Sequence, residues 1–241
     1  MNTLSAFHAI EETMRAHPRE CILHVAAGSR ALGPRARRIV EEARRLGVRI
    51  HEVQPEALAH MSPDQKGVVL EMPRDVVPTR SLDDLCQPEI TEGLVLVLDH
   101  IEDPQNLGAI LRSADAFGAD AVIIPSRRAA PLTEAVKRAS AGAAAWIPVV
   151  QTGNLAQAVD QLEKAGWWVY ATDMDGKPLA DTTLSRKAVI ILGNEGKGVG
   201  RLLQTMADET IAIPMRGHVD SLNVSVTAGI VLYEFRRNST R

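Results

Sequence analysis

Cysteine is scarce in this sequence of 241 residues, which contains only Cys21 and Cys86. Two thiols so far apart in the chain exclude a disulfide-rich scaffold and a cysteine-rich zinc site. The seven histidines show no spacing of metal ligands such as HExxH, so no metal site is predicted. We therefore expect two reduced thiols in a cytoplasmic protein.

Long apolar runs and an excess of basic residues are also lacking. No stretch of roughly 18 apolar residues occurs, so no membrane span is predicted. Residues 1–10 lack the basic and apolar regions of a secretory signal. The chain has 27 Lys and Arg against 30 Asp and Glu, and only 3% of its residues are aromatic. Nucleic-acid binding through overall positive charge or an aromatic platform is therefore not supported, and any RNA contact must be a local patch.

The composition is otherwise that of a folded globular protein, with 45% apolar and 24% charged residues. Residues 73–92 differ from their surroundings, because they contain several prolines and acids and little apolar periodicity. We interpret this segment as a linker. It separates a small N-terminal domain, residues 1–72, from a larger C-terminal domain, residues 93–241.

Both predicted domains alternate helices with strands. In the first, the apolar periodicity predicts helices near residues 5–14 and 35–46, and strands at residues 22–25, 48–53 and 68–70. In the second, it predicts strands at residues 94–98, 121–124, 146–150, 167–171, 188–192 and 210–213. Helices are expected between most of these strands. The pattern indicates an α/β protein whose larger domain has a mostly parallel sheet with helices on both faces.

The last predicted helix, about residues 221–235, carries apolar residues on two nearly opposite sides. One stripe contains Leu222, Val226, Gly229 and Tyr233, and the other contains Val224, Ala228, Val231 and Phe235. A helix that is apolar on two sides is normally buried on two sides. The second cover is either another part of this chain or a partner subunit, and the pattern does not decide between them.

Ligands of open α/β sheets bind beyond the carboxyl ends of the strands, so functional residues are expected in the loops there. The loop after residues 94–98 leads to Asn106, which also suits a helix N-cap, and to Arg112, which lies off the apolar stripe of its helix. A glycine-rich loop, residues 193–200, follows the strand at 188–192. It is either a plain turn or a loop that lets the backbone approach a ligand. Polar residues, with Ser221 as the expected N-cap, precede the last helix.

These three loops, in this order, resemble the three motifs of the SpoU/TrmH family in the SPOUT class of methyltransferases. The segments that carry the resemblance are DPQNLGAILRS at residues 103–113, ILGNEGKG at 191–198, and IPM at 213–215 with SLNVSV at 221–226. Each motif alone is weak. Three motifs in order, each after a predicted strand, make a specific signal over the whole second domain.

The resemblance implies an RNA 2′-O-ribose methyltransferase that uses S-adenosylmethionine. It also implies a deep trefoil knot in the C-terminal domain and a homodimer with the active site near the interface. The residues implied to hold the cofactor are Gly193, Ile213, Leu222, Gly196 and Met215. Arg112 is the implied central catalytic residue, and the residues implied to orient it and the ribose are Asn106, Glu195, Asn223 and Ser225.

Arg112 is assigned a base role in this family, but a guanidinium with a pKa above about 12 is a poor proton acceptor. Anchoring the target phosphate and stabilising the developing alkoxide are physically easier roles for this side chain.

The first domain resembles the small RNA-binding domain, itself similar to a ribosomal protein, of family members that methylate a guanosine in bacterial large-subunit (23S) ribosomal RNA. The segments FHAI at residues 7–10 and QKGV at 65–68 carry this likeness, although Ala6 and Asp64 replace the usual glycine and histidine. The arginine-rich helix at residues 35–49 is either an RNA contact or a solvated face. Arg127 and Arg128 are further candidates for phosphate contact.

Three other functions remain as alternatives. A transfer-RNA ribose methyltransferase would use the same chemistry on another RNA. A non-catalytic RNA-binding factor in ribosome assembly would bind RNA without the cofactor. A nucleotide-dependent oxidoreductase would need a glycine-rich loop after the first strand of the larger domain, and residues 99–106 do not supply one. RNA is the expected macromolecular partner, and neither DNA nor a membrane is expected.

Overall fold

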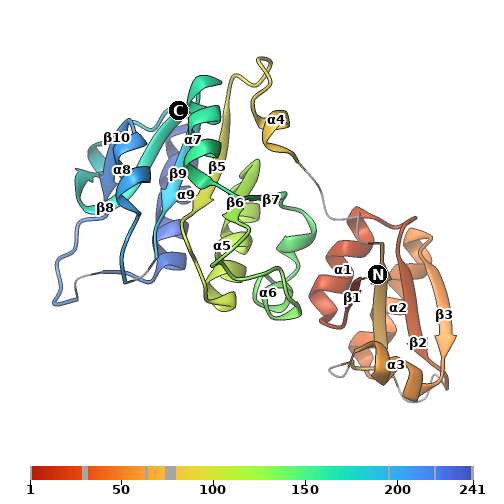
Figure 1. Ribbon diagram of the computed structural model, residues 1–241. Coiled ribbons are helices and arrows are strands. Elements are labelled where there is room, and N and C mark those ends of the chain that lie inside the picture. Colours follow the sequence, from red (N-terminus) through yellow and green to blue (C-terminus); the bar gives the residue numbers. More distant parts are fainter. Residues whose placement is uncertain are drawn as a thin grey trace. The chain divides into compact units, whose positions relative to one another are not determined.

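The computed structural model describes residues 2–28, 32–62, 65–73, 80–194, 196–219 and 221–239. The chain forms two compact units. Unit 1 comprises residues 1–78 together with 141–146, and unit 2 comprises residues 79–140 and 147–241. Figure 1 shows the elements of each unit in the colours of the sequence. Among the described helices, none has both the length and the apolar composition needed to cross a membrane.

Unit 1 is built on a four-stranded sheet of order β1-β4-β2-β3. Strands β2 and β3 are parallel, whereas β4 runs antiparallel to both β1 and β2. The strands are β1 (Asn2–Leu4), β2 (Ile22–Ala26), β3 (Arg49–Val53) and β4 (Val68–Met72), and the helices are α1 (Phe7–Ala16), α2 (Pro34–Leu46) and α3 (Pro55–Met61). The apolar sides of α1 and α2 belong to one core with Leu23 and Leu70, which are both fully buried. Strand β1 and helix α3 are absent from the sequence prediction because each is short.

Unit 2 is built on a six-stranded sheet of order β10-β8-β9-β5-β6-β7, in which all neighbouring strands are parallel. The predicted mostly parallel sheet is therefore confirmed. Its strands are β5 (Gly93–Leu98), β6 (Ala121–Pro125), β7 (Val149–Thr152), β8 (Trp168–Pro178), β9 (Lys187–Leu192) and β10 (Glu209–Ala212). Strands β5 and β9 lie at the centre. Their near-continuous apolar sequences suit this position, because both faces of a central strand are buried.

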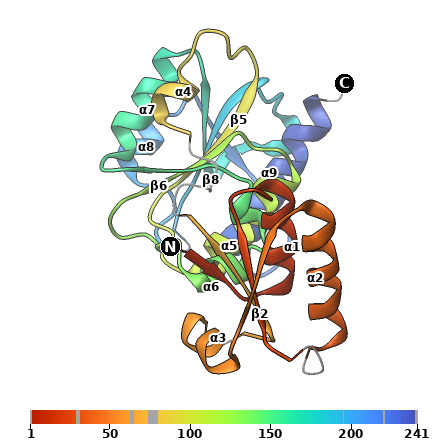
Figure 2. The same cartoon turned by 90° about the vertical axis from the view of Figure 1, so that its right-hand side faces the viewer.

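Helices cover both faces of the sheet in unit 2, as Figure 2 shows. One face carries α4 (Leu82–Leu85), α7 (Leu155–Lys164) and α8 (Arg201–Met206), whose apolar residues share a core with Val95, Val97 and Ile191. The other carries α5 (Pro104–Ala116), α6 (Glu134–Ala139) and α9 (Val224–Ser239). Two short 3-10 turns, η3 (Ala143–Ala145) and η4 (Leu179–Asp181), complete the elements of the described residues.

The segment predicted as a linker is only partly one. Residues 80–92 belong to unit 2, and within them Ser81 and Asp84 form a capping box at the start of α4. Leu85 is fully buried, and its carbonyl accepts a hydrogen bond from Nε1 of buried Trp167 at 2.9 Å. This helix was not predicted from the sequence, because a single fully buried leucine among prolines and acids gives no apolar periodicity.

The two cysteines are free and lie in separate units. Cys21 belongs to the core of unit 1, and burial raises the pKa of its thiol to about 11. Cys86 is partly buried at the end of α4, and burial also raises the pKa of its thiol. Both thiols are therefore held in the protonated, unreactive form near neutral pH.

Candidate functional site

A cavity of about 460 Å³ lies in unit 2 at the carboxyl ends of β9 and β10 and beside the middle of β8. Residues of β8 and β10, the loops that follow β9 and β10, and the first turns of α9 form its wall. All five residues assigned to the cofactor by resemblance line this one cavity: Gly193, Gly196, Ile213, Met215 and Leu222. The structure thus brings together residues from two loops that are separate in the sequence.

The loop after β9 folds tightly back on itself. Asn194 and Gly198 pair through two backbone hydrogen bonds, and Gly198 has a positive φ of 65°. Glycine is required at position 193, because a Cβ atom there would lie 2.0 Å from the backbone carbon of Gly198. Glu195, which the resemblance places in the same loop, lies outside the described residues.

Asp99, at the end of the neighbouring strand β5, anchors this loop by a hydrogen bond. It follows β5 directly and is 7% exposed. One carboxylate oxygen accepts the backbone N–H of Gly200 at 2.7 Å, and the other lies 2.5 Å from Nδ1 of His100. Asn194 donates its side-chain amide to the carbonyl of His100 at 3.0 Å. Asp99 is not among the predicted site residues, although an acid directly after a wholly apolar strand is an available signal.

A second cluster lies at the start of α5 and α9. The side-chain nitrogen of Asn223 donates to Oδ1 of Asn106 at 2.9 Å. Oδ1 of Asn223 accepts hydrogen bonds from the backbone N–H of Ser225, at 2.9 Å, and from its hydroxyl, at 2.5 Å. Three of the five predicted catalytic residues are therefore joined in one network, and the N-termini of two helices meet there.

Two predicted N-caps are wrong. Asp103 caps α5 by accepting the backbone N–H of Gln105 at 2.9 Å, and Pro104 occupies the first turn. Asn106 therefore lies inside the helix and is 8% exposed. Helix α9 begins at Val224, so Ser221 lies outside its first turn. The capping oxygen at that end belongs to Asn223, because its side chain accepts the N–H of Ser225.

Arg112 belongs neither to the cavity lining nor to the hydrogen-bond network of Asn106, Asn223 and Ser225. It lies on the exposed side of α5 and does not line the cavity. Within the described part of the chain it has no hydrogen bond or ion pair. Its guanidinium is therefore exposed on the same helix that carries Asn106.

Only one of the two apolar stripes of α9 is buried in unit 2. Val224, Ala228, Val231 and Phe235 are each less than 7% exposed. On the other side, Val226 is 48%, Ile230 37% and Tyr233 57% exposed. The chain therefore leaves an apolar surface on α9, which we call the α9 face.

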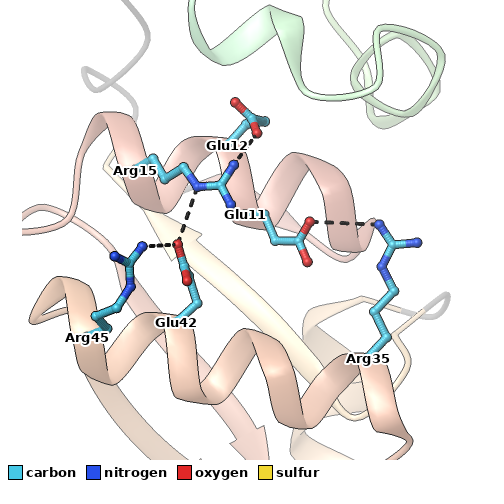
Figure 3. A network of polar contacts seen from close by, with 6 residues as sticks. All are labelled: Glu11, Glu12, Arg15, Arg35, Glu42 and Arg45. Carbon is cyan, nitrogen blue, oxygen red and sulfur yellow. Dashed lines mark hydrogen bonds and ion pairs between the residues drawn. The ribbon is translucent and has the colours of Figure 1, made fainter.

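Ion pairs occupy part of the arginine-rich surface of unit 1 (Figure 3). Glu42 of α2 forms ion pairs with Arg45 at 2.7 Å and with Arg15 of α1 at 3.3 Å. The hydrogen bond from Arg45 lowers the pKa of Glu42. Arg35 lies 3.8 Å from Glu11. By contrast, the exposed Arg38 and Arg44 have no ion pair within the described residues. Some arginines of this surface are therefore ion-paired, and others, among the described residues, are not.

The two segments of unit 1 that carry the family likeness lie together. The ring of Phe7, at the start of α1, has Lys66 Nζ 5.8 Å and the Arg35 guanidinium 5.6 Å from its centroid. Gly67 follows Lys66 with a positive φ of 88°. Two cations and a partly exposed aromatic ring therefore form a local positively charged patch.

The fold and cavity define an α/β protein with a small-molecule site beyond the carboxyl ends of a parallel sheet. The model of the SpoU rRNA Methylase family matches residues 93–233, and that of the RNA 2′-O ribose methyltransferase substrate binding domain matches residues 7–75. The chain therefore belongs to the SpoU rRNA methylase family.

Known proteins resemble the chain over both units. It is 38% identical to the 23S rRNA (guanosine-2′-O-)-methyltransferase RlmB of Pseudomonas syringae pv. tomato, over 95% of this chain and 93% of that protein. The SpoU methyltransferase AviRb of Streptomyces viridochromogenes, solved in complex with AdoMet, has a TM-score of 0.76 at 26% identity over 99% of this chain and 90% of that chain. An AdoMet-bound rRNA methyltransferase from Sinorhizobium meliloti has a TM-score of 0.74 at 25% identity, covering 98% and 86%.

Proposed function

We propose that this protein transfers a methyl group from S-adenosylmethionine to the 2′-hydroxyl of a guanosine in 23S ribosomal RNA. One observation carries the proposal. The five residues assigned to the cofactor line a single cavity, and the chain that forms its wall continues directly into the Asn106–Asn223–Ser225 network. A donor pocket adjoins a polar cluster suited to a ribose.

The cavity suits the cofactor in size and chemistry. Its volume of about 460 Å³ falls within the usual range of small-ligand pockets, roughly 300–1,000 Å³. Apolar side chains such as Ile213 and Leu222 would face the adenine, while the loop beginning at Gly193 offers backbone groups to it. When bound, the cofactor supplies an electrophilic methyl group on a sulfonium.

The residues of the chain would position the ribose and stabilise the charge that develops on its oxygen. Methyl transfer needs the oxygen, carbon and sulfur in line, so holding the ribose is a large part of catalysis. Asn106 and Asn223 lie where the positive ends of the α5 and α9 dipoles meet, which favours a developing alkoxide. Arg112 would grip the adjoining phosphate, and Glu195 and Ser225 would orient these groups.

Unit 1 would capture the RNA. The match of residues 7–75 to a substrate-binding domain and the Phe7 patch with Lys66 and Arg35 support this role. The relative from Pseudomonas syringae spans both units and is named for 23S rRNA, which favours ribosomal RNA over transfer RNA. Arg38 and Arg44 of α2, with Arg127 and Arg128 of unit 2, are further phosphate contacts in this proposal. A likeness of unit 1 to a ribosomal protein stays a prediction.

The proposal includes a homodimer in the cytoplasm and a trefoil knot. The exposed α9 face supports a partner subunit, because Val226, Ile230 and Tyr233 gather on one side of a helix that packs on α5. Arg112, exposed on α5, would then complete the site near the dimer interface. The tight loop at residues 193–198 and the segment after β10, which both line the cavity, are the parts of the chain that would form the knot.

The proposal is tested by incubating the protein with methyl-labelled donor and three separate substrates: 23S rRNA, large ribosomal subunits and transfer RNA. The labelled nucleotide is then mapped by its resistance to alkaline cleavage. Label on one guanosine of 23S rRNA is expected. Label on transfer RNA alone would favour the tRNA alternative. RNA binding without any donor binding would favour an assembly factor.

A further inference from the structure

Two charged side chains occur among the described residues that line the cavity, Asp173 and Lys197. Asp173 is held in place from two directions. Gln204 of α8 donates its side-chain amide to Oδ2 at 2.6 Å, and the backbone N–H of Asp175 donates to Oδ1 at 3.1 Å. Each carboxylate oxygen accepts more than one hydrogen bond. Asp173 is therefore a fixed acceptor with capacity left for a ligand.

The position of Asp173 in the sheet indicates which part of a ligand it meets. Strands β8 and β9 are parallel neighbours, and their pairing ends at Ala171 and Ile191. The glycine-rich loop that begins at Gly193 follows β9. Asp173 lies in β8, two positions after Ala171, the last residue of β8 that pairs with β9. In dinucleotide-binding sheets a related layout, a glycine-rich loop after one strand and an acid near the end of its pairing on the adjacent one, places the carboxylate on a ribose hydroxyl.

A competing partner for this carboxylate is the positive charge of the methyl donor. Methyl transfer removes the charge of the sulfonium, so a carboxylate placed against it would stabilise the reactant more than the transition state. Such an arrangement would slow the reaction. The ribose hydroxyls keep their character throughout the transfer, and binding them has no such consequence.

We propose that Asp173 binds the vicinal 2′- and 3′-hydroxyl groups of the cofactor's ribose. This inference rests on the proposed function, because it names a residue of the same pocket that the family resemblance did not supply. It gives Gln204 a positioning role, since that side chain holds the carboxylate without lining the cavity.

The test compares Asp173→Ala, Asp173→Asn and the control Asp175→Asn with the unaltered chain. Asp175 belongs to the same strand, β8, but does not line the cavity. Calorimetry gives the dissociation constants for S-adenosylmethionine, S-adenosylhomocysteine and 5′-methylthioadenosine. All three ligands have the ribose diol, whereas they differ in the sulfonium charge and the amino-acid group. Adenosine and 2′,3′-dideoxyadenosine form a further pair that differs only in the diol, and thermal melts confirm that each variant is folded.

We expect Asp173→Ala to raise the dissociation constants of S-adenosylmethionine, S-adenosylhomocysteine and 5′-methylthioadenosine by a similar factor. The factor should be about ten- to a hundredfold, as for the loss of hydrogen bonds to a charged group. Asp173→Asn keeps one acceptor oxygen, so its affinity for these ligands should fall less. The affinity of Asp175→Asn should be unchanged. The preference of the unaltered chain for adenosine over dideoxyadenosine should disappear in Asp173→Ala.

Two results would overturn the assignment: unchanged binding in folded Asp173→Ala, or weakening confined to ligands that carry the amino-acid group or the sulfonium. A loss of methyl transfer with unchanged binding would also contradict it. If the unaltered chain binds none of the ligands, the proposed function itself is wrong, and the role of Asp173 is rejected with it.

Discussion

Asn223 donates its side-chain amide to Asn106, a residue 117 positions earlier in the chain, across 2.9 Å. The same asparagine caps the start of α9 through its Oδ1 atom. One side chain therefore joins the first turns of α5 and α9 and fixes the polar groups that would face a ribose. A change at this position alters both the alignment of the site and the end of a helix.

Replacing Asn223 with alanine should lower kcat for methyl transfer by about a hundredfold, because a preorganised donor in the site is lost. The free energy of unfolding should fall by about 1 kcal/mol from the lost cap. The matched control is Asn154→Ala, since Asn154 caps α7 by accepting the N–H of Gln157 at 3.2 Å and lies outside the site. Equal activity of the two variants at equal stability would contradict the role of Asn223.

Replacing Arg112 with alanine should reduce methyl transfer by at least about a hundredfold, because the guanidinium is expected to hold the target phosphate and to stabilise the alkoxide. Binding of the donor should persist, since Arg112 does not line the cavity. Turnover assays and calorimetry measure the two effects separately. Arg186→Ala, which removes another exposed arginine of unit 2, serves as the control. Parallel loss of donor binding in folded Arg112→Ala protein would show that this role is assigned wrongly.

Alanine should destabilise the chain strongly at position 193 and only slightly, if at all, at position 196. A Cβ at Gly193 would lie 2.0 Å from backbone carbon, so Gly193→Ala should destabilise unit 2 by about 2 kcal/mol or more. A Cβ at Gly196 would meet only Oδ1 of Asn194, at 3.7 Å, so the free energy of unfolding should change by less than about 0.5 kcal/mol.

Because Gly196 lines the cavity, its alanine variant should nevertheless bind S-adenosylmethionine more weakly than the unaltered chain. Denaturant unfolding and calorimetry check the pair of variants. Unimpaired donor binding by Gly196→Ala would argue against the position given to the cofactor.

Leu85→Ala should destabilise unit 2 by about 2–5 kcal/mol, as expected for a fully buried leucine. Leu82→Ala, in the same short helix but only partly buried, should have a smaller effect. Denaturant unfolding followed by tryptophan fluorescence measures the change in stability, and one of the three tryptophans, Trp167, donates to the carbonyl of Leu85. If Leu85→Ala were as stable as the unaltered chain, residues 80–92 would act as a linker after all.

Ile230→Asp should convert a dimer to monomers, because it places a charge on the apolar α9 face. Ile230 is 37% exposed, so the stability of the isolated subunit should change little. Sedimentation velocity measures the mass. Leu202→Asp is the control, since Leu202 is 63% exposed on α8, which lies on the other face of the sheet. A monomeric unaltered chain, or a dimer that persists in Ile230→Asp, would contradict the proposed interface.

The sequence by itself predicted the parallel sheet of unit 2, most of its helices and the three loops that carry the motifs. These features depend on local patterns: the apolar run of β5, the helical spacing of Leu107, Ile110 and Leu111, and glycines where the chain turns. The residues assigned to the cofactor could be named in advance only because the three motifs resemble those of a known family.

The tertiary structure alone decided which of these residues meet. The pairing of Asn106 with Asn223, the hold of Asp99 on Gly200, and the burial of Leu85 each join positions far apart in the chain. It also decided which stripe of α9 is buried in unit 2, since both stripes are apolar in the sequence. Periodicity reports how a segment is patterned, whereas a hydrogen bond between distant residues depends on the packing of every element between them.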